Sequence, residues 1–198
     1  YPRTDILYSS NNEEEMGRLK EKLGLPKDKK VIMYAPTWRV RDKFELMLDL
    51  EKMKEKFSDE YVLILRLHHF SAKGWKGVPA DGFVYDLTDY ESIEDLYIIT
   101  DILITDYSSV SWDVYYQEKP VVFYPFDLET YEKVQGSYMD YKKDVFGDLA
   151  WDQNQLVDLI GEYARNGFRE KPEFSGRRDE LLPYRDNDNS KRIYEYIA

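Results

Sequence analysis

The stretch from residue 102 to 113, Ile-Leu-Ile-Thr-Asp-Tyr-Ser-Ser-Val-Ser-Trp-Asp, constrains the fold more than any other part of the chain. It opens with a short apolar run rich in β-branched residues, which is typical of a buried parallel strand. It then passes through Ser108 and Ser109 into an apolar pattern that is compatible with a helix. A strand that turns directly into a helix leaves free backbone N–H groups, which suit a phosphate together with the two hydroxyls. A simple helix cap by either serine is the alternative interpretation of this stretch.

Apolar strands alternate with amphipathic helices along the rest of the chain. We expect strands at 31–35, 61–68, 83–86, 102–104 and 121–124, and helices at 13–23, 44–57, 92–99, from about 110, around 156–163 and at 189–197. We expect an extended lead-in at 1–10, a long surface loop at 131–146 and irregular structure at 170–185. The alternation predicts an α/β fold, a doubly wound, Rossmann-like parallel sheet flanked by helices.

Composition bounds the class of protein. A chain of 198 residues with 42% hydrophobic residues can bury a sizeable core as one domain or two small ones. Its net charge of -11 argues against a general nucleic-acid binder, which needs a basic surface. The absence of cysteine excludes disulfides and thiolate metal sites and fits a cytoplasmic setting. No apolar run approaches the roughly 18–20 residues that span a bilayer, and the opening without Met suggests a piece of a longer protein.

Several common catalytic motifs are missing from the chain. It has neither a P-loop nor a Gly-x-Gly-x-x-Gly dinucleotide motif, and no Gly-x-Ser-x-Gly nucleophile motif. The two histidines, His68 and His69, are adjacent, and neighbours on a strand point to opposite faces. A two-histidine metal centre is therefore not expected.

Polar residues lie at the carboxyl ends of three of the predicted strands, at 36–39, 66–68 and 105–109. In doubly wound sheets, ligands bind at the carboxyl ends of the strands near a switch in strand order. Beside Arg66, His68 is a plausible hydrogen-bond donor to a phosphate. A structural histidine and an ion-paired arginine are the alternatives for these two residues.

Three further residues carry two interpretations each. Arg3 is either a ligand contact or a surface charge. Trp38 is either a base-stacking platform or, slightly favoured, a core residue. Asp113 lies one helical turn after Ser109, where it can accept hydrogen bonds from ribose hydroxyls or simply favour the positive end of the helix.

The combination of motifs resembles the CDP-glycerol glycerophosphotransferase family of teichoic acid synthesis, which includes glycerol phosphate polymerases and primases. The resemblance runs through Tyr-Pro-Arg-Thr-Asp at 1–5, Tyr-Ala-Pro-Thr-Trp-Arg at 34–39, Leu-Arg-Leu-His at 65–68, Thr-Asp-Tyr-Ser-Ser-Val at 105–110, Lys-Pro-Val-Val-Phe-Tyr at 119–124, and Gly136, Tyr138 and Asp140. Members are similar to two-domain GT-B type glycosyltransferases. The resemblance implies that residues 1–198 are one domain, the carboxyl-terminal half that binds the nucleotide-activated donor.

The resemblance also implies a reaction and its residues. Glycerol phosphate would pass from CDP-glycerol to a hydroxyl of a poly(glycerol phosphate) acceptor, releasing CMP. The residues expected to contact the diphosphate or nearby groups are Arg3, Thr37, Arg66, His68, Ser108 and Ser109. Asp113 would hold the ribose, while Pro36, Trp38 and Leu67 would also lie in the donor site. His68 is expected to stabilise charge on the leaving CMP.

The expected general base, a histidine, belongs to the amino-terminal domain, so we expect this chain alone to bind donor weakly without turnover. No cofactor and no metal site in this chain are expected, since the family type generally uses protein cations in place of a metal, while the metal dependence of the reaction is left open. The lipid-linked acceptor and peripheral contact with the cytoplasmic face of a bacterial plasma membrane would involve sequence outside this chain. A CDP-ribitol phosphotransferase, a sugar-nucleotide glycosyltransferase of the same fold and a non-catalytic α/β binding module remain alternatives.

Overall fold

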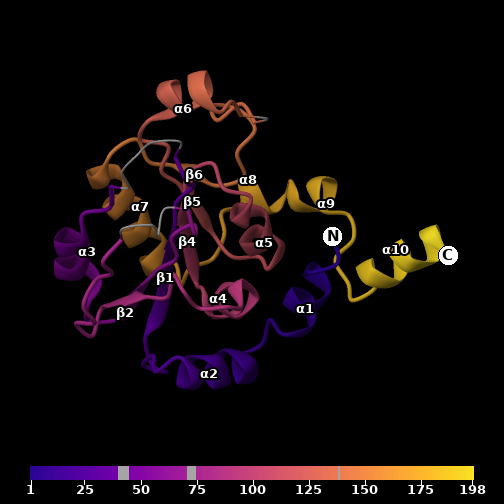
Figure 1. Cartoon of the computed structure of the whole chain (residues 1–198), viewed down its shortest axis with the longest axis horizontal. Helices are drawn as coiled ribbons and strands as arrows, with labels where there is room; N and C mark the ends of the chain where they lie inside the picture. Colours follow the sequence, from indigo (N-terminus) through magenta and orange to yellow (C-terminus); the bar gives the residue numbers. More distant parts are fainter. Residues whose placement is uncertain (40–44, 71–74, 138) are drawn as a thin grey trace.

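One parallel sheet forms the centre of the computed structural model, which describes residues 1–39, 45–70, 75–137 and 139–198 (Figure 1). Its strands are β1 (Lys30–Ala35), β2 (Tyr61–Leu65), β3 (Val84–Asp86), β4 (Ile102–Thr105), β5 (Val121–Phe123) and β6 (Asp148–Leu149). The order β3-β2-β1-β4-β5-β6 joins only parallel neighbours. The chain builds outward from β1 to β3 and then crosses to the other side of β1, so a topological switch point lies between β1 and β4. The predicted fold class is confirmed.

Helices pack on both faces of this sheet, as Figure 1 shows. The helices are α1 (Thr4–Ser9), α2 (Glu13–Lys22), α3 (Leu50–Phe57), α4 (Ile93–Ile99), α5 (Val110–Tyr116), α6 (Leu128–Val134), α7 (Gln153–Arg165), α8 (Pro172–Ser175), α9 (Arg178–Leu181) and α10 (Asn189–Ile197). Alternate residues of β1 enter different cores because strand side chains alternate between faces. Val31 and Met33 pack with α1, α2, α4 and α5, whereas Ile32 and Tyr34 pack with α3 and α7.

Local signals placed several helix ends correctly. The Asn12 side chain accepts a hydrogen bond from the Glu15 amide and caps α2, and Ser92 does the same for α4. Gly24 follows α2 with a φ of 69°, a left-handed conformation that glycine adopts without strain. The predicted helices at 13–23 and 92–99 are confirmed within one residue at each end.

Three predicted boundaries are wrong. The segment at 1–10 is not an extended lead-in, because residues 4–9 form α1, which buries Leu7 fully and leaves Ile6 48% exposed. The helix predicted at 44–57 begins at Leu50, where the Asp49 side chain caps it by accepting from the Lys52 amide; residue 44 lies outside the described residues. The strand predicted at 61–68 ends at residue 65.

The region from 131 to 146 is not a long surface loop. Residues 128–134 form α6, and the side chains of Tyr131, Tyr141 and Phe146 are buried. Phe146 stacks on Tyr115 at 4.4 Å between ring centroids, which ties this region to α5. The segment at 170–185, predicted as irregular, contains α8 and α9.

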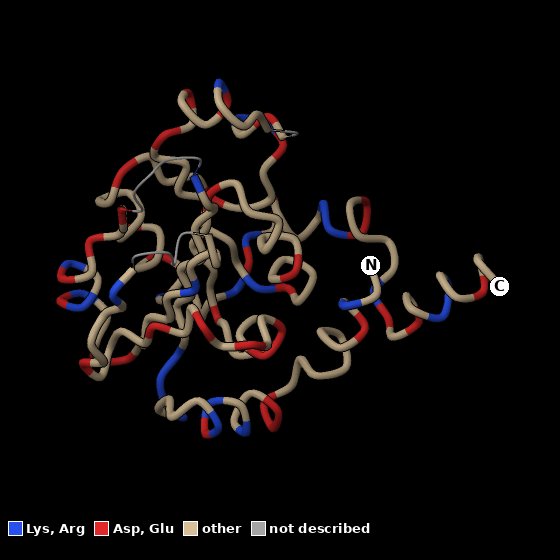
Figure 2. The backbone as a smooth tube through the Cα atoms, viewed as in Figure 1, with Lys and Arg blue, Asp and Glu red and all other residues tan. Residues whose placement is uncertain are grey.

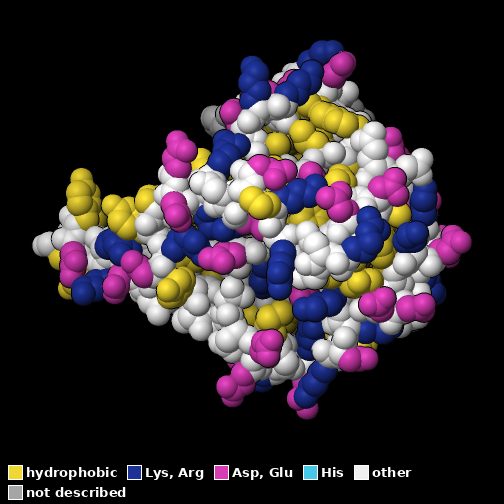
Figure 3. All heavy atoms as spheres, turned by 180° about the vertical axis from the view of Figure 1, so that it is seen from behind, with side chains coloured by type: hydrophobic (Ala, Val, Ile, Leu, Met, Phe, Trp, Pro, Cys, Tyr) yellow, Lys and Arg dark blue, Asp and Glu magenta, His cyan; other side chains and the backbone are white. Residues whose placement is uncertain are grey.

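The carboxyl-terminal helix α10 projects from the body of the protein, and Figure 3 shows hydrophobic side chains at this end. Tyr196 is 91% exposed and Ile197 is 75% exposed. Asp5 of α1 holds the start of α10, since its carboxylate accepts from the amides of Asn189 and Ser190, both at 2.9 Å. No helix in the described part of the chain is long and apolar enough to cross a membrane.

Candidate functional site

The carboxyl ends of β1, β2 and β4 lie side by side. Tyr34 is aligned with Leu65, and Ala35 is aligned with Thr105. The polar segments that follow these strands therefore leave the same edge of the sheet, next to the switch point. The Thr37 amide donates to Asp106 at 2.7 Å and joins two of these segments directly.

His68 lies in the segment after β2 with an exposed side chain. Its Nδ1 accepts a hydrogen bond from the Phe70 amide at 3.3 Å. A neutral imidazole that accepts at Nδ1 carries its proton on Nε2, so Nε2–H is the donor that this form offers to a ligand. Partial burial, followed by the neighbouring charge of His69, lowers the pKa of His68 below its usual value, which favours this neutral form near pH 7.

The expectation that His68 and His69 point to opposite faces is wrong. The strand ends before both residues, so strict alternation no longer applies. Their ring centroids lie 4.2 Å apart, and both rings contact Phe70. Trp38 also belongs to this aromatic group, since its ring lies 5.2 Å from Phe70 and 6.5 Å from His68. The Trp38 ring therefore lies beside the candidate phosphate donor.

The Thr37 hydroxyl is a buried oxygen without a hydrogen-bond partner among the described residues. Buried polar atoms in folded proteins are nearly always paired, so such an atom needs an explanation. The backbone around it is held firmly, because the Thr37 amide donates to Asp106 and its carbonyl accepts from Arg39 at 2.7 Å. A ligand oxygen is one partner that would satisfy the hydroxyl.

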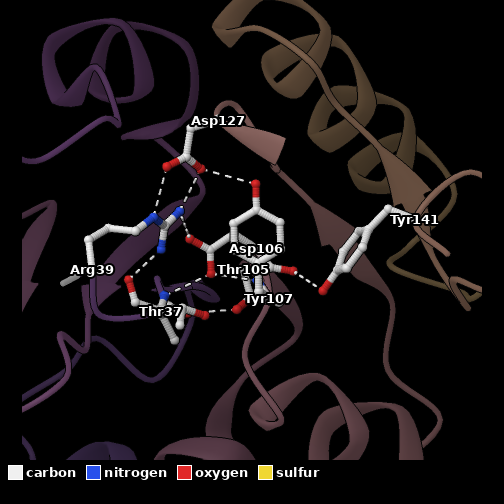
Figure 4. A network of polar contacts seen from close by, with 8 residues as sticks. Thr37, Arg39, Thr105, Asp106, Tyr107, Asp127 and Tyr141 are labelled. Carbon is white, nitrogen blue, oxygen red and sulfur yellow. Dashed lines mark hydrogen bonds and ion pairs between the residues drawn. The ribbon is translucent and has the colours of Figure 1, made fainter. Parts of the chain in front are cut away.

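Arg39 forms the centre of a polar network that Figure 4 shows. Its guanidinium donates twice to Asp127, both at 2.9 Å, and once to Asp106 at 2.8 Å. Asp127 also accepts from the Tyr107 hydroxyl at 3.0 Å, and Asp106 accepts from the Tyr107 amide at 2.6 Å. The network joins the segments after β1, β4 and β5, and so determines where Thr37 lies relative to the start of α5.

The charges in this network stabilise one another. Burial opposes the charge on Arg39, but the hydrogen bonds to Asp127 and the charge of Asp106 outweigh it and raise the pKa of Arg39. Burial likewise opposes ionisation of Asp127, and the Arg39 guanidinium more than compensates, so the pKa of Asp127 is lowered. Tyr107 and Tyr131 lie 4.9 Å and 5.1 Å from the guanidinium carbon, within cation–π range. Four of the five N–H groups of Arg39 thus donate to protein acceptors.

A second group of predicted residues meets between α1 and α5. Arg3 donates twice to the Asp113 carboxylate, at 2.9 Å and 2.6 Å. Asp113 is only 2% exposed, and burial raises its pKa to about 6 although the Arg3 charge opposes the shift. Arg3, Ser109 and Asp113 line a cavity of 270 Å³ whose other walls are largely aromatic, with Trp112 and Tyr116 among them. Each carboxylate oxygen keeps lone-pair capacity for a further donor.

Ser108 and Ser109 do not act as a strong helix cap. Ser109 occupies the N-cap position of α5, yet its side chain makes no capping hydrogen bond. Ser108 Oγ accepts from the Val110 amide at a long 3.4 Å. Within the described residues, the exposed Ser109 hydroxyl is therefore not used in capping and can contact a ligand.

Arg66 points its guanidinium to the backbone carbonyls of Leu87 and Thr88. Among the described residues no carboxylate lies within 4.0 Å of it, so the alternative of an ion-paired Arg66 is not supported. Its charge also acts on the buried Tyr97. Burial and the charge of Asp113 raise the pKa of Tyr97, and the charges of Arg3 and Arg66 oppose this shift. Tyr97 thus lies near three of the predicted residues.

The sequence matches the family described as CDP-Glycerol:Poly(glycerophosphate) glycerophosphotransferase over residues 1–198. The chain belongs to this family. Teichoic acid poly(glycerol phosphate) polymerase of Bacillus subtilis (strain 168) is 37% identical over 205 residues, covering 100% of this chain and 28% of the relative. Teichoic acid glycerol-phosphate transferase of Staphylococcus aureus (strain NCTC 8325 / PS 47) is 41% identical over 169 residues, covering 81% and 43%.

Solved structures of this glycerophosphotransferase family have the same fold. The wall teichoic acid polymerase TagF superposes with a TM-score of 0.84 at 32% identity, covering 100% of this chain and 50% of that structure. A TagF H444N structure that matches with a TM-score of 0.82 was obtained after a soak with CDPG. The chain therefore spans about half of the TagF chain and 28% to 52% of the first relatives.

Two of the predicted site residues offer little side-chain surface. Leu67 is 2% exposed and Pro36 is buried, so any ligand would meet mainly their backbone. Tyr138, which belongs to the motifs that carry the family resemblance, lies outside the described residues. In the described part of the chain, no group of three or more His, Asp or Glu side chains could hold a metal ion.

Sequence reasoning assigned no role to Arg39, Asp106, Tyr97 or Asp127. Arg39 and Asp106 stand within the motifs that carried the resemblance, at 34–39 and 105–110, so a signal was present. Asp127 lies 88 residues from Arg39 along the chain and has no motif of its own. Only the folded structure brings it to the site.

Proposed function

We propose that this chain is the donor-binding half of a CDP-glycerol glycerophosphotransferase. It would bind CDP-glycerol at the carboxyl edge of the sheet for transfer of glycerol phosphate to a hydroxyl of a poly(glycerol phosphate) acceptor, with release of CMP. The acceptor oxygen would form a bond to the phosphorus that carries glycerol, and the bond from that phosphorus to the CMP oxygen would break. The departing CMP keeps the electron pair of that bond.

The observation that carries this proposal is the unpartnered Thr37 hydroxyl at the edge where β1, β2 and β4 end. Two other donors belong to the same edge, His68 through Nε2–H and Ser109 through its free hydroxyl. Phosphoryl transfer depends mainly on positioning and charge stabilisation. Neutral hydrogen-bond donors stabilise the developing negative charge without transferring a proton. His68 would stabilise the charge that develops on CMP.

Arg3 and Asp113 would hold the nucleoside end of the donor. Asp113 keeps lone pairs for ribose hydroxyls while it holds Arg3, and Arg3 keeps a further N–H group for a phosphate oxygen. The general base and the lipid-linked acceptor site belong, in this proposal, to sequence outside residues 1–198. Peripheral contact with the cytoplasmic face of a bacterial membrane would also come from there, so this chain alone would not turn over.

Three alternative functions remain for comparison with this proposal. A CDP-ribitol phosphotransferase is favoured by one relative, a teichoic acid poly(ribitol-phosphate) polymerase of Bacillus spizizenii (strain ATCC 23059 / NRRL B-14472 / W23) that is 33% identical. A sugar-nucleotide glycosyltransferase would prefer UDP-sugars. A non-catalytic module would bind no nucleotide while folding normally. Each makes a different prediction for the same set of ligands.

The proposal is tested by following backbone amide NMR signals while CDP-glycerol is added. We expect saturable shifts in residues 37–39, 66–69 and 107–110, and affinity reduced about tenfold by His68→Ala or Ser109→Ala, as for loss of one charge-assisted hydrogen bond. Ser175→Ala, which removes an exposed hydroxyl from α8, is the matched control and should bind normally. Shifts elsewhere, or equal affinity in all three variants, would exclude this donor site.

A further inference from the structure

A pocket of 430 Å³ lies at the opposite edge of the sheet, where β1 and β4 begin. Five lysines and three carboxylates line it, so its wall carries a net charge of +2 within a chain of net charge -11. Four of the lysines come from α2, from the segment that follows it and from the first residue of β1, and Figure 2 shows blue at the entry into β1. β1 is six residues long, about 20 Å at the usual rise, so this pocket is separate from the donor edge.

Three of these lysines have no carboxylate within 4.0 Å among the described residues. Lys20 Nζ donates to the carbonyl of Lys29 at 2.7 Å, and Lys29 Nζ donates to the carbonyl of Ser58 at 2.6 Å. Lys119 Nζ donates to three acceptors, among them the carbonyl of Ile98 at 2.6 Å. An ammonium has three N–H groups. Lys20 and Lys29 therefore each keep two for a ligand, while Lys119 keeps none, and burial lowers the pKa of Lys119 to about 7.

The remaining charged groups of the pocket do not neutralise this cluster. Lys30 pairs with Asp101 at 2.9 Å, and the second oxygen of Asp101 accepts from the Val31 amide at 2.8 Å. Lys27 pairs with a glutamate of α2 at 2.6 Å. Glu13 and Asp28, the other carboxylates of the wall, are exposed to solvent, which weakens their attraction for buried cations.

Two of the unpaired lysines are more than nine-tenths buried, Lys20 at 6% exposure and Lys119 at 9%. Burial lowers the pKa of both lysines, and the charge of Lys30 lowers each of them further, with Asp101 opposing. Removing cations from water without a counter-charge is costly. An anion that entered the pocket would offset this cost, which makes the site favourable for a ligand with several oxygens.

We propose that this pocket binds a phosphate group through Lys20 and Lys29. Lysine ammonium groups are common phosphate ligands, and each of these two lining side chains keeps two N–H groups beyond its bond to a backbone carbonyl. Its volume leaves space for the organic part of a phosphate ester. The phosphate comes either from a phosphodiester of a poly(glycerol phosphate) chain or from a free monoester, since both present the same oxygens. The site stands apart from the donor edge, so it does not depend on the proposed function.

The test is an NMR titration with inorganic phosphate, with ionic strength held constant by sodium chloride. The variants are Lys20→Gln and Lys29→Gln, which remove the charge but keep an N–H donor for the backbone carbonyl. Lys54→Gln is the matched control, because it removes one lysine from α3, where Lys54 pairs with Asp81 outside the pocket. Folding of each variant is verified by circular dichroism and thermal unfolding.

We expect saturable shifts at Gly17, Val31 and Gly167 and about tenfold weaker phosphate binding in each pocket variant, the size expected for losing one bond to a charged group. Lys54→Gln should bind as the unmodified chain does. Linear shifts equal to those from chloride, or equal affinity in all variants, would overturn the proposal.

The source of the phosphate follows from two further probes. Tighter binding of a glycerol phosphodiester oligomer than of glycerol 3-phosphate would support the site and assign it to the polymer. The reverse order would support the site and assign it to a free monoester. Loss of CDP-glycerol binding at the donor edge would leave these results unchanged, so failure of one proposal is distinguishable from failure of the other.

Discussion

The Arg39 network leads to the most demanding prediction on stability. The Arg39 side chain is 18% exposed, and its two carboxylate partners, Asp106 and Asp127, are 2% and 19% exposed. Arg39→Met keeps the aliphatic stem and removes the charge. The variant would leave a buried carboxylate without its cation, which costs about 3–5 kcal/mol in comparable sites. Because Arg39 and Asp127 retain some contact with water, we expect about 3 kcal/mol.

The assay is urea unfolding followed by tryptophan fluorescence, in which Trp38 reports on the segment that Arg39 holds. Lys54→Met is the matched control, since Lys54 pairs with Asp81 at 2.6 Å but both side chains are largely solvated, at 40% and 32% exposure. We expect a midpoint shift several times larger for Arg39→Met than for Lys54→Met. Equal shifts would refute the argument that the network is a buried, mutually dependent unit.

Two further predictions concern single contacts. A Cβ at Gly147 would lie 2.1 Å from the backbone oxygen of Val121, so Gly147→Ala should destabilise the fold by about 3 kcal/mol. A Cβ at Gly17, which lies in α2, would meet no atom within 4 Å, so Gly17→Ala should stabilise the fold by about 0.5–1 kcal/mol. Thermal unfolding that ranks the two variants the other way would contradict the geometry. Hydrogen bonds from the amides at the start of α10 lower the pKa of Asp5 from its ordinary value near 3.8 to about 2. The stability that the Asp5 carboxylate contributes to the fold is therefore fully present above pH 3.8 and is lost as the pH falls through 2. Asp5→Asn should therefore loosen hydrogen-exchange protection of α10 at neutral pH, and unchanged protection would exclude this cap.

Local sequence signals predicted the parts of the fold that depend on neighbours in the chain. The starts of α2 and α4 are examples, because each is set by a side chain, Asn12 or Ser92, that accepts from an amide three residues away. The apolar strand runs were equally clear, because a buried parallel strand needs apolar residues on both faces. Short elements without a repeating pattern were missed, namely α1, α6, α8, α9 and β6. Their stability comes from tertiary contacts such as the burial of Leu7 and Tyr131.

The sequence suggested single residues for the candidate site but did not predict their pairings. The motifs identified Arg3 and Asp113 as separate ligand contacts, yet the fold binds them to each other across 110 positions of sequence. Likewise, Arg39 reaches Asp127 across 88 positions. Such pairs depend on where α1, α5 and α6 lie on the sheet, which no local periodicity specifies.

The most direct test of the central claim is calorimetric titration of this chain with CDP-glycerol, beside CDP-ribitol, CMP and UDP-glucose. We expect a CDP-alcohol to bind in preference to UDP-glucose, with CDP-glycerol the tightest of the four and the affinity reduced by His68→Ala and Ser109→Ala. Tighter binding of UDP-glucose, or no heat from any ligand while the chain remains folded, would contradict the claim that residues 1–198 supply the CDP-glycerol site.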